Sequence, residues 1–172
     1  MKILILGDAR HGKDTVADLI SKHTGLTSLA SSVAALNIFL YDLLREKYGL
    51  TYGSVMEAFK DRVNHREIYY NEICEYNKED KTRLVKEIQK VADIYTGLRN
   101  AEEVEQAIEE GLFDLIIGVN NPRIPKEPIS SNTASAEKYS HLMIENDGTL
   151  LDLEEKIMLL IIRNHYNFRN DN

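Results

Sequence analysis

The sequence predicts a three-layer α/β/α fold with a mostly parallel sheet of about five strands. Three observations predict it. Short apolar runs alternate with segments of helical periodicity, an order typical of a parallel sheet covered by helices. The first apolar run passes at once into a glycine-containing loop and then a helix. A long helical stretch, about residues 32–91, interrupts the alternation, and we expect it to be an insertion within a single domain, residues 1–172.

The N-terminal part contains the first strand, loop and helix. Residues 2–6 are apolar and rich in β-branched side chains, as in a strand buried on both faces. Residues 7–12 are a loop, and apolar side chains at helical spacing predict a helix over 13–23, which Gly25 ends. A second strand is expected at 26–30.

The remaining elements follow the insertion. The expected elements are strands at 92–96, 113–119 and 141–144 and helices at 101–110 and 150–162. The helix at 101–110 carries five carboxylates, which we interpret as an exposed acidic face: Glu102, Glu103, Glu105, Glu109 and Glu110.

Two segments carry turn-forming or polar residues in place of an apolar pattern. Residues 120–136 hold all three prolines of the chain and a cluster of Ser, Asn and Thr, so we expect a loop or mobile lid there. Residues 164–172 form a polar tail that we expect to be frayed.

Composition excludes several classes of function. The formal net charge is -7, which does not favour non-specific binding to DNA or to anionic membranes. The single cysteine, Cys74, excludes an intrachain disulfide and a Cys-rich zinc site. The apolar runs are too short to span a membrane. We therefore expect a cytoplasmic protein without a membrane partner, and a homodimer is compatible with the sequence.

The loop after the first strand carries the strongest chemical signal. Residues 7–13 read Gly-Asp-Ala-Arg-His-Gly-Lys and match G-x-x-x-x-G-K, the phosphate-binding P-loop, with the strand before and the helix after that this motif requires. Loop N–H groups and the helix N-terminus hold phosphate oxygens, and Lys13 reaches the β- and γ-phosphates. The expected ATP-binding residues are Gly7, Asp8, Ala9, Arg10, His11, Gly12, Lys13, Asp14 and Thr15.

The motif departs from its common form at one position. The hydroxyl residue that usually follows the lysine and contacts Mg²⁺ is Asp14 here, and Thr15 comes next. Asp14 can hold Mg²⁺ directly or through water, can act as a base toward an acceptor, or can simply favour the first turn of a helix. Asp14 and Thr15 are the candidate metal-binding residues.

Three segments resemble one family. Residues 12–18, Gly-Lys-Asp-Thr-Val-Ala-Asp, resemble the GKDT-type phosphate loop of phage deoxynucleoside monophosphate kinases, and residues 96–103 and 144–150 are similar to later segments of that family. The resemblance implies a P-loop kinase-like fold, host-cytoplasmic location if the chain is phage-encoded, and transfer of the γ-phosphoryl group of ATP to a nucleotide. By the same resemblance Arg99 contacts the acceptor or the transferred group and Arg123 is a lid arginine, which makes Lys13, Asp14, Arg99 and Arg123 the catalytic candidates.

The acceptor site is expected in the insertion. Lys60, Arg62, His65 and Arg66 form a basic cluster, and arginine suits a phosphate because it binds bidentately. Tyr70 can stack on a base. Arg62, Arg66 and Tyr70 are therefore the candidate substrate-binding residues, although the same spacing also fits a solvated helix face with packed tyrosines.

Two other functions stay open. A P-loop kinase can phosphorylate an alcohol, for example a hydroxymethyl pyrimidine in phage DNA, and Asp14 or Asp8 would then be the base. A non-catalytic nucleotide-binding protein is the third class, since no apolar strand ends in the aspartate of a Walker-B motif. The expected partner is a small nucleotide acceptor, with DNA under the second function.

Overall fold

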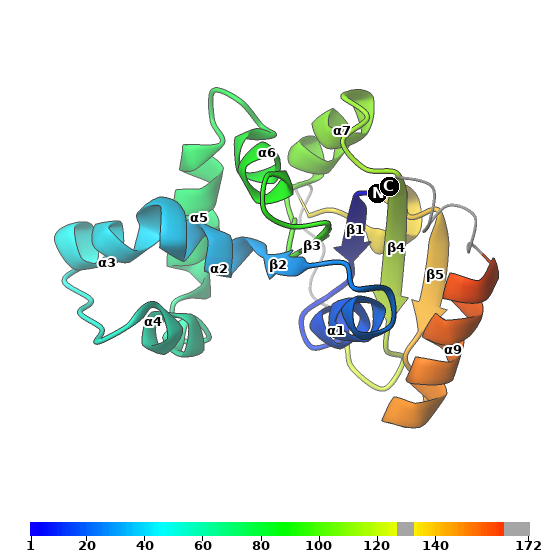
Figure 1. Ribbon diagram of the computed structural model, residues 1–172. Helices are drawn as coiled ribbons and strands as arrows, with labels where there is room; N and C mark the ends of the chain where they lie inside the picture. The colour runs from blue at the N-terminus through cyan, green and yellow to red at the C-terminus, as the bar shows by residue number, and fades with distance from the viewer. Residues whose placement is uncertain (127–132, 164–172) are drawn as a thin grey trace.

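The computed structural model describes residues 1–126 and 133–163. Its strands form one five-stranded sheet, parallel throughout, in the order β2-β3-β1-β4-β5 (Figure 1). The strands are β1 (Ile3–Leu6), β2 (Ser28–Ala30), β3 (Ile94–Thr96), β4 (Leu115–Asn120) and β5 (Leu142–Glu145). The predicted fold class is confirmed. The expected frayed tail and part of the expected lid lie outside the described residues.

The helices cover both faces of this sheet. They are α1 (Lys13–Thr24), α2 (Ser31–Ala35), α3 (Tyr41–Tyr48), α4 (Val55–Asp61), α5 (Arg66–Tyr76), α6 (Arg83–Gln89), α7 (Ala101–Glu109), α8 (Ala136–Tyr139) and α9 (Leu150–Arg163). Alternate residues of β1 show the layers: Ile3 and Ile5 are buried with α1 and α9, whereas Leu4 and Leu6 are buried with α2, α6 and α7. This is the period-2 burial of a strand covered on both sides.

The insertion between β2 and β3 is helical, as predicted. It contains α2 to α6, and a π-helical turn, η1 (Leu36–Leu40), joins α2 directly to α3. Leu36, Leu40 and Leu44 follow one another at helical spacing and are all buried, which fixes the face that packs inward. Figure 1 shows α3, α4 and α5 set to one side of the sheet, beyond β2. Among the described residues, no helix is long and apolar enough to cross a membrane.

Every strand runs in the same direction, so all five end at one edge of the sheet. The segments that follow β1, β2, β3 and β4 therefore start close together, and β1 lies at the centre of the order with β3 and β4 on either side. In open parallel sheets this edge is where ligands bind, and here it is the edge from which the insertion also departs.

Candidate active site

The phosphate loop between β1 and α1 is built so that only glycine fits at two positions. Gly7 has φ 147° and a Cβ there would lie 2.4 Å from the carbonyl oxygen of Val119. Gly12 has φ 98° and a Cβ would lie 2.4 Å from Nδ2 of Asn146. The chain therefore passes directly against β4 and Asn146, and backbone of this shape turns its N–H groups toward a bound anion.

His11 ties the loop to β4 through its side chain. Its ring is 1% exposed, and Nδ1 accepts a hydrogen bond of 3.0 Å from the backbone N–H of Asn121. Asn146 donates from Nδ2 to the His11 carbonyl oxygen at 3.1 Å. The His11 ring therefore braces the loop, in addition to what its backbone contributes.

Lys13 lies over the loop. Its Nζ donates a hydrogen bond of 2.7 Å to the carbonyl oxygen of Asp8, and the side chain is largely buried. The ammonium group is thus held within the loop that it would serve, where a P-loop lysine meets phosphate oxygens.

Asp14, the residue that replaces the usual hydroxyl, is in the first turn of α1. Its Oδ1 accepts a hydrogen bond of 2.9 Å from the Thr96 hydroxyl at the end of β3. The described residues contain no group of three or more His, Cys, Asp or Glu side chains that could hold a metal ion by themselves. One carboxylate fits Mg²⁺, because this ion is commonly bound by one or two carboxylates together with waters and substrate phosphates.

A cavity of about 390 Å³ opens beside the loop. Its walls come from the loop, the start of α2, the segment after α4, helix α5, strand β3 and the segment after it, and α7. Eight of the residues predicted from sequence line it: Ala9, Arg10, Lys13, Asp14, Arg62, Arg66, Tyr70 and Arg99. The fold therefore brings the predicted phosphate-binding and acceptor-binding residues to one place.

Positive charge is concentrated in this cavity. Burial lowers the pKa of Arg62, while Asp14 raises it and the neighbouring cations of Arg66 and Arg99 lower it again, so these four side chains are electrostatic neighbours. The Arg62 guanidinium lies 3.7 Å from the centre of the Phe59 ring and donates a hydrogen bond of 2.9 Å to the Phe59 carbonyl oxygen. Held in this way, Arg62 keeps a fixed position in the wall.

Six of the predicted site residues are outside this lining, and four of them, Gly7, Asp8, His11 and Gly12, belong to the rest of the phosphate loop. Arg123 follows β4, where its backbone N–H donates to Oδ1 of Asn121, and its charge acts on Asp147. Within the described chain it is outside the residues that line the cavity, and its lid role stays a prediction. Thr15, in the first turn of α1, is also outside that lining among the described residues.

The interpretation of the acidic run on α7 was wrong for one residue. Glu102, Glu105, Glu109 and Glu110 are exposed, but Glu103 is 3% exposed and lines the cavity. A signal was present in the sequence, because Glu103 shares the buried face of the helix with Val104 and Ala107. Tyr95, at the centre of β3, is a second lining residue that the sequence analysis did not select.

Comparison with solved structures places this arrangement in a known fold. Shikimate kinase from Aquifex aeolicus is 14% identical, with 96% of this chain and 99% of that chain covered and a TM-score of 0.50. Shikimate kinase from Acinetobacter baumannii, in complex with shikimate, is 18% identical, with 95% and 93% covered and a TM-score of 0.50. The chain has the P-loop kinase fold. No protein-family model matches it, and no curated protein matches it significantly.

A third solved structure is similar to this chain over nearly its whole length. The protein TT1252 from Thermus thermophilus is 17% identical, with 95% of this chain and 97% of that chain covered and a TM-score of 0.50. At these identities the likeness concerns the fold alone.

Proposed function

We propose that this chain is an ATP-dependent phosphotransferase, specifically a (deoxy)nucleoside monophosphate kinase that transfers the γ-phosphoryl group of ATP to a nucleotide. One observation carries the proposal: the cavity that begins at Lys13 and Asp14 is lined by Arg62, Arg66 and Arg99. A site with a phosphate loop at one end and three guanidinium groups beside it suits two phosphorylated molecules.

The donor half is the loop. Its glycines at positive φ, together with the contacts of the buried His11 with Asn121 and Asn146, keep the backbone in an anion-binding shape before any ligand arrives. Lys13 places one positive charge where the transferred group would develop negative charge. Bound Mg²⁺ would supply charge neutralisation and orientation of the ATP phosphates, and Asp14 is the residue that would hold it.

The acceptor half is the insertion. A nucleotide phosphate is anionic near neutral pH, so it needs cations for binding and no general base for attack. The arginines supply the cations, and Tyr70, 37% exposed at the cavity wall, offers an aromatic face for a base. The cavity volume of about 390 Å³ lies within the range of small-molecule sites. The names of two structural neighbours, both shikimate kinases, also support a small acceptor.

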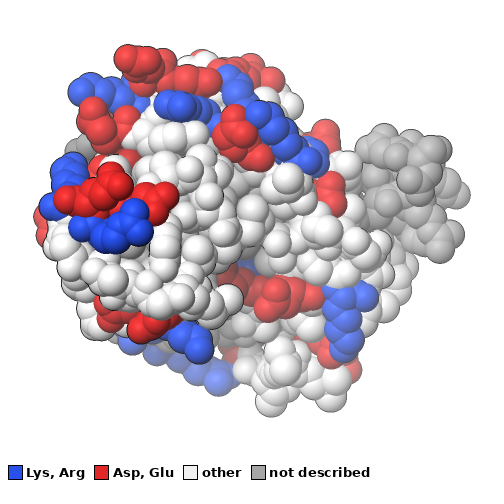
Figure 2. All heavy atoms as spheres, turned by 60° about the vertical axis from the view of Figure 1, so that its left-hand side comes forward, with Lys and Arg blue, Asp and Glu red and all other residues white. Residues whose placement is uncertain are grey.

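The surface charge favours a small acceptor over DNA. In Figure 2 the insertion side of Figure 1 comes forward. On the face shown, Lys and Arg side chains are interspersed with Asp and Glu, and they form no continuous basic band. The net charge of -7 agrees. Duplex DNA is bound chiefly through rows of cations that meet its phosphates.

An acceptor panel with labelled ATP and Mg²⁺ tests the proposal. We expect label transfer to at least one of the common nucleoside monophosphates, and loss of transfer in Lys13→Ala. Transfer only to hydroxymethylated DNA or to another alcohol would reject the nucleotide acceptor. Binding of ATP without transfer to any acceptor would reject an enzyme.

A kinase of an alcohol is the second candidate, and one observation favours it. The Asp14 carboxylate lines the same cavity as the acceptor arginines and is held there by Thr96. A carboxylate between donor and acceptor is well placed to take the proton of a hydroxyl group. Substitution of Asp14 distinguishes the two acceptors, as set out in the Discussion.

A further inference from the structure

A second group of polar side chains lines the cavity, separate in character from the arginines. Burial raises the pKa of Tyr95, of Tyr70 and of Cys74, and the negative charge of Glu103 raises each of them further. Glu103 is therefore close to all three. These four residues come from β3, α5 and α7, and all line the cavity.

Glu103 is buried, and no ion pair joins it to a Lys, Arg or His within residues 1–126 and 133–163. It is 3% exposed, and burial raises its pKa to about 7, against the lowering effects of the Asn77 amide and the Lys81 ammonium; the Glu102 charge raises it slightly more. Lys81 makes its ion pair of 2.9 Å with Glu102. A buried carboxyl group in this state costs stability, and a ligand that donates hydrogen bonds to it would offset that cost.

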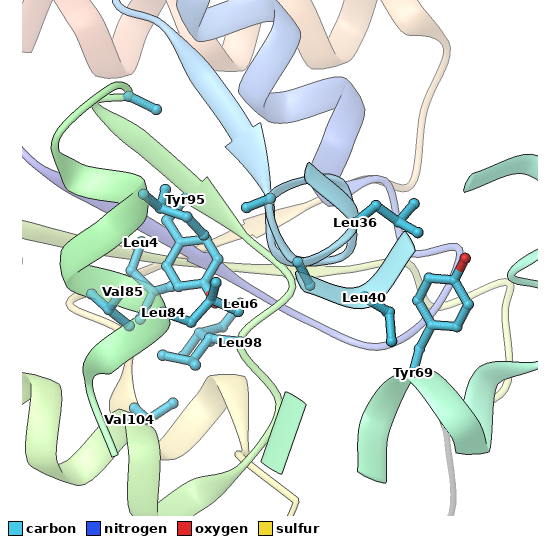
Figure 3. Close-up of a cluster of buried hydrophobic side chains, with 14 of the residues drawn as sticks. Leu4, Leu6, Leu36, Leu40, Tyr69, Leu84, Val85, Tyr95, Leu98 and Val104 are labelled. Atoms are coloured by element: carbon cyan, nitrogen blue, oxygen red, sulfur yellow. The ribbon is translucent and has the colours of Figure 1, made fainter. Parts of the chain in front are cut away.

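Tyr95 carries the second buried polar group. Its ring is 1% exposed and packs in the apolar cluster with Leu4, Leu6 and Leu98 (Figure 3), while its hydroxyl makes no hydrogen bond within the described chain. Buried tyrosine hydroxyls usually have a partner. Burial, more than the charge of Glu103, raises the pKa of Tyr95, and a polar neighbour, the Ser31 hydroxyl, lowers it. A molecule bound in the cavity could supply the hydrogen bond that the protein itself does not complete.

We propose that Glu103 and Tyr95 form a subsite that recognises the amino-bearing edge of the acceptor's nucleobase. The inference rests on the proposed function, because it assigns the base end of a nucleotide whose phosphate lies at the arginines. The Glu103 carboxylate accepts a hydrogen bond from an exocyclic amino group. The Tyr95 hydroxyl can donate or accept, so it pairs with the adjacent ring nitrogen or carbonyl.

The subsite predicts a specificity. Adenine, cytosine and guanine each offer an amino group, whereas thymine presents carbonyl oxygens on both sides of its N–H. Above the raised pKa of Glu103, where the group is ionised, a carbonyl oxygen against it leaves the carboxylate unpaired, and an unpaired buried polar group is what makes such sites selective. The discrimination is therefore measured at a pH above 7.

Equilibrium binding of dAMP, dCMP, dGMP and dTMP, measured without ATP, tests this subsite. Wild type is expected to bind at least one amino-bearing nucleotide about tenfold to a hundredfold more tightly than dTMP. Glu103→Gln and Tyr95→Phe should each reduce that ratio toward one. The matched controls are Glu102→Gln, which changes the exposed neighbour, and Tyr139→Phe, which changes a tyrosine whose hydroxyl contacts Glu105 and Lys138. Both controls should keep the ratio.

Four outcomes of these binding measurements would contradict the subsite. Equal affinity for all four nucleotides, a preference for dTMP, no nucleotide binding at all, or an unchanged ratio in folded Glu103→Gln would overturn the subsite. Failure of the proposed function is separate, because it is measured as phosphoryl transfer. If nucleotides bind in the expected order but are never phosphorylated, the kinase is rejected and the subsite is kept. If nucleotides are phosphorylated but Glu103→Gln does not change which of them is preferred, the subsite is rejected and the kinase is kept.

Discussion

The hydroxyl of Thr96 donates a hydrogen bond of 2.9 Å to Oδ1 of Asp14, across 82 positions of sequence. The bond joins the carboxyl end of β3 to the first turn of α1. It fixes the carboxylate beside Lys13 and leaves the other oxygen, Oδ2, for a metal ion, a water molecule or an acceptor hydroxyl. The role of Asp14 is therefore the point on which the two candidate reactions differ.

Asp14→Ser is expected to keep most of the turnover. Serine restores the hydroxyl that P-loops commonly present to Mg²⁺, and a phosphate acceptor needs no base. The measurements are the turnover number and the ATP dissociation constant. A fall of roughly two to four decades in turnover at unchanged ATP affinity would instead identify Asp14 as a base and the acceptor as an alcohol. Thr96→Val, which removes only the hydrogen bond to Asp14, is expected to have a smaller effect than loss of a base.

Lys13→Ala is expected to lower turnover by about two to three decades, the usual effect of removing one group that stabilises transition-state charge. Its side chain serves phosphate and bonds to the loop, so the melting temperature should change little. Lys60→Ala, at an exposed position of the insertion, is the control and should retain activity. Near wild-type turnover in Lys13→Ala would contradict the assignment of the loop.

Arg66→Ala is expected to weaken acceptor binding about tenfold to a hundredfold, because a hydrogen bond to a charged group is lost. Affinity for ATP should stay within a factor of a few, since the loop is intact. Arg45→Ala is the matched control, because Arg45 is an exposed arginine paired with Asp42 on α3. An equal loss of ATP and acceptor affinity in Arg66→Ala would show that Arg66 supports the fold and not the acceptor.

Gly12→Ala is expected to destabilise the protein more than Gly25→Ala. Both positions have positive φ, 98° and 78°, which costs a side chain about 1–2 kcal/mol. At Gly25 an added Cβ meets nothing within 4 Å, whereas at Gly12 it meets Nδ2 of Asn146 at 2.4 Å. Thermal or urea unfolding gives the difference. If the two variants lose the same stability, Asn146 does not press on the loop as described.

The pH dependence of the unfolding free energy is expected to show that Glu103 has a raised pKa in the folded protein. Its pKa rises from 4.5 to about 7 on folding, so the native state holds the proton more tightly and its contribution to the unfolding free energy falls as pH rises through this interval. The total is at most about 3 kcal/mol. Glu103→Gln removes the titration, so the variant should gain stability relative to wild type between pH 5 and 8. A constant difference across that range would show that Glu103 is not buried as an acid.

Sequence reasoning succeeded wherever the pattern was local. The strand, loop and helix around Lys13 follow from apolar period and glycine placement, and the insertion follows from its continuous helical spacing. The helical spacing with Val104 and Ala107 could have placed Glu103 on the buried face, but that Glu103 and Tyr95 line a cavity was not predictable from local pattern. Whether a carboxylate on a helix faces solvent or a cavity depends on what packs against that helix, and this is a property of the assembled fold. Proximity of Thr96 to Asp14 likewise depends on the order of strands in the sheet.

The uninterrupted helical run from α2 through η1 to α3 connects the outer part of the insertion to the wall of the cavity. Ser31 begins this run, and its hydroxyl bonds to the Gly97 carbonyl oxygen at 3.1 Å, next to Thr96. As an α-helix, a run of this length spans about 27 Å. The π-helical turn η1 lies at its middle, and a π-helical turn is one of the few places at which a helix kinks sharply. The outer end at Tyr48 and the inner end beside Thr96 are therefore joined through one point at which the run can bend, and η1 sets the direction of α3 relative to the residue that holds Asp14.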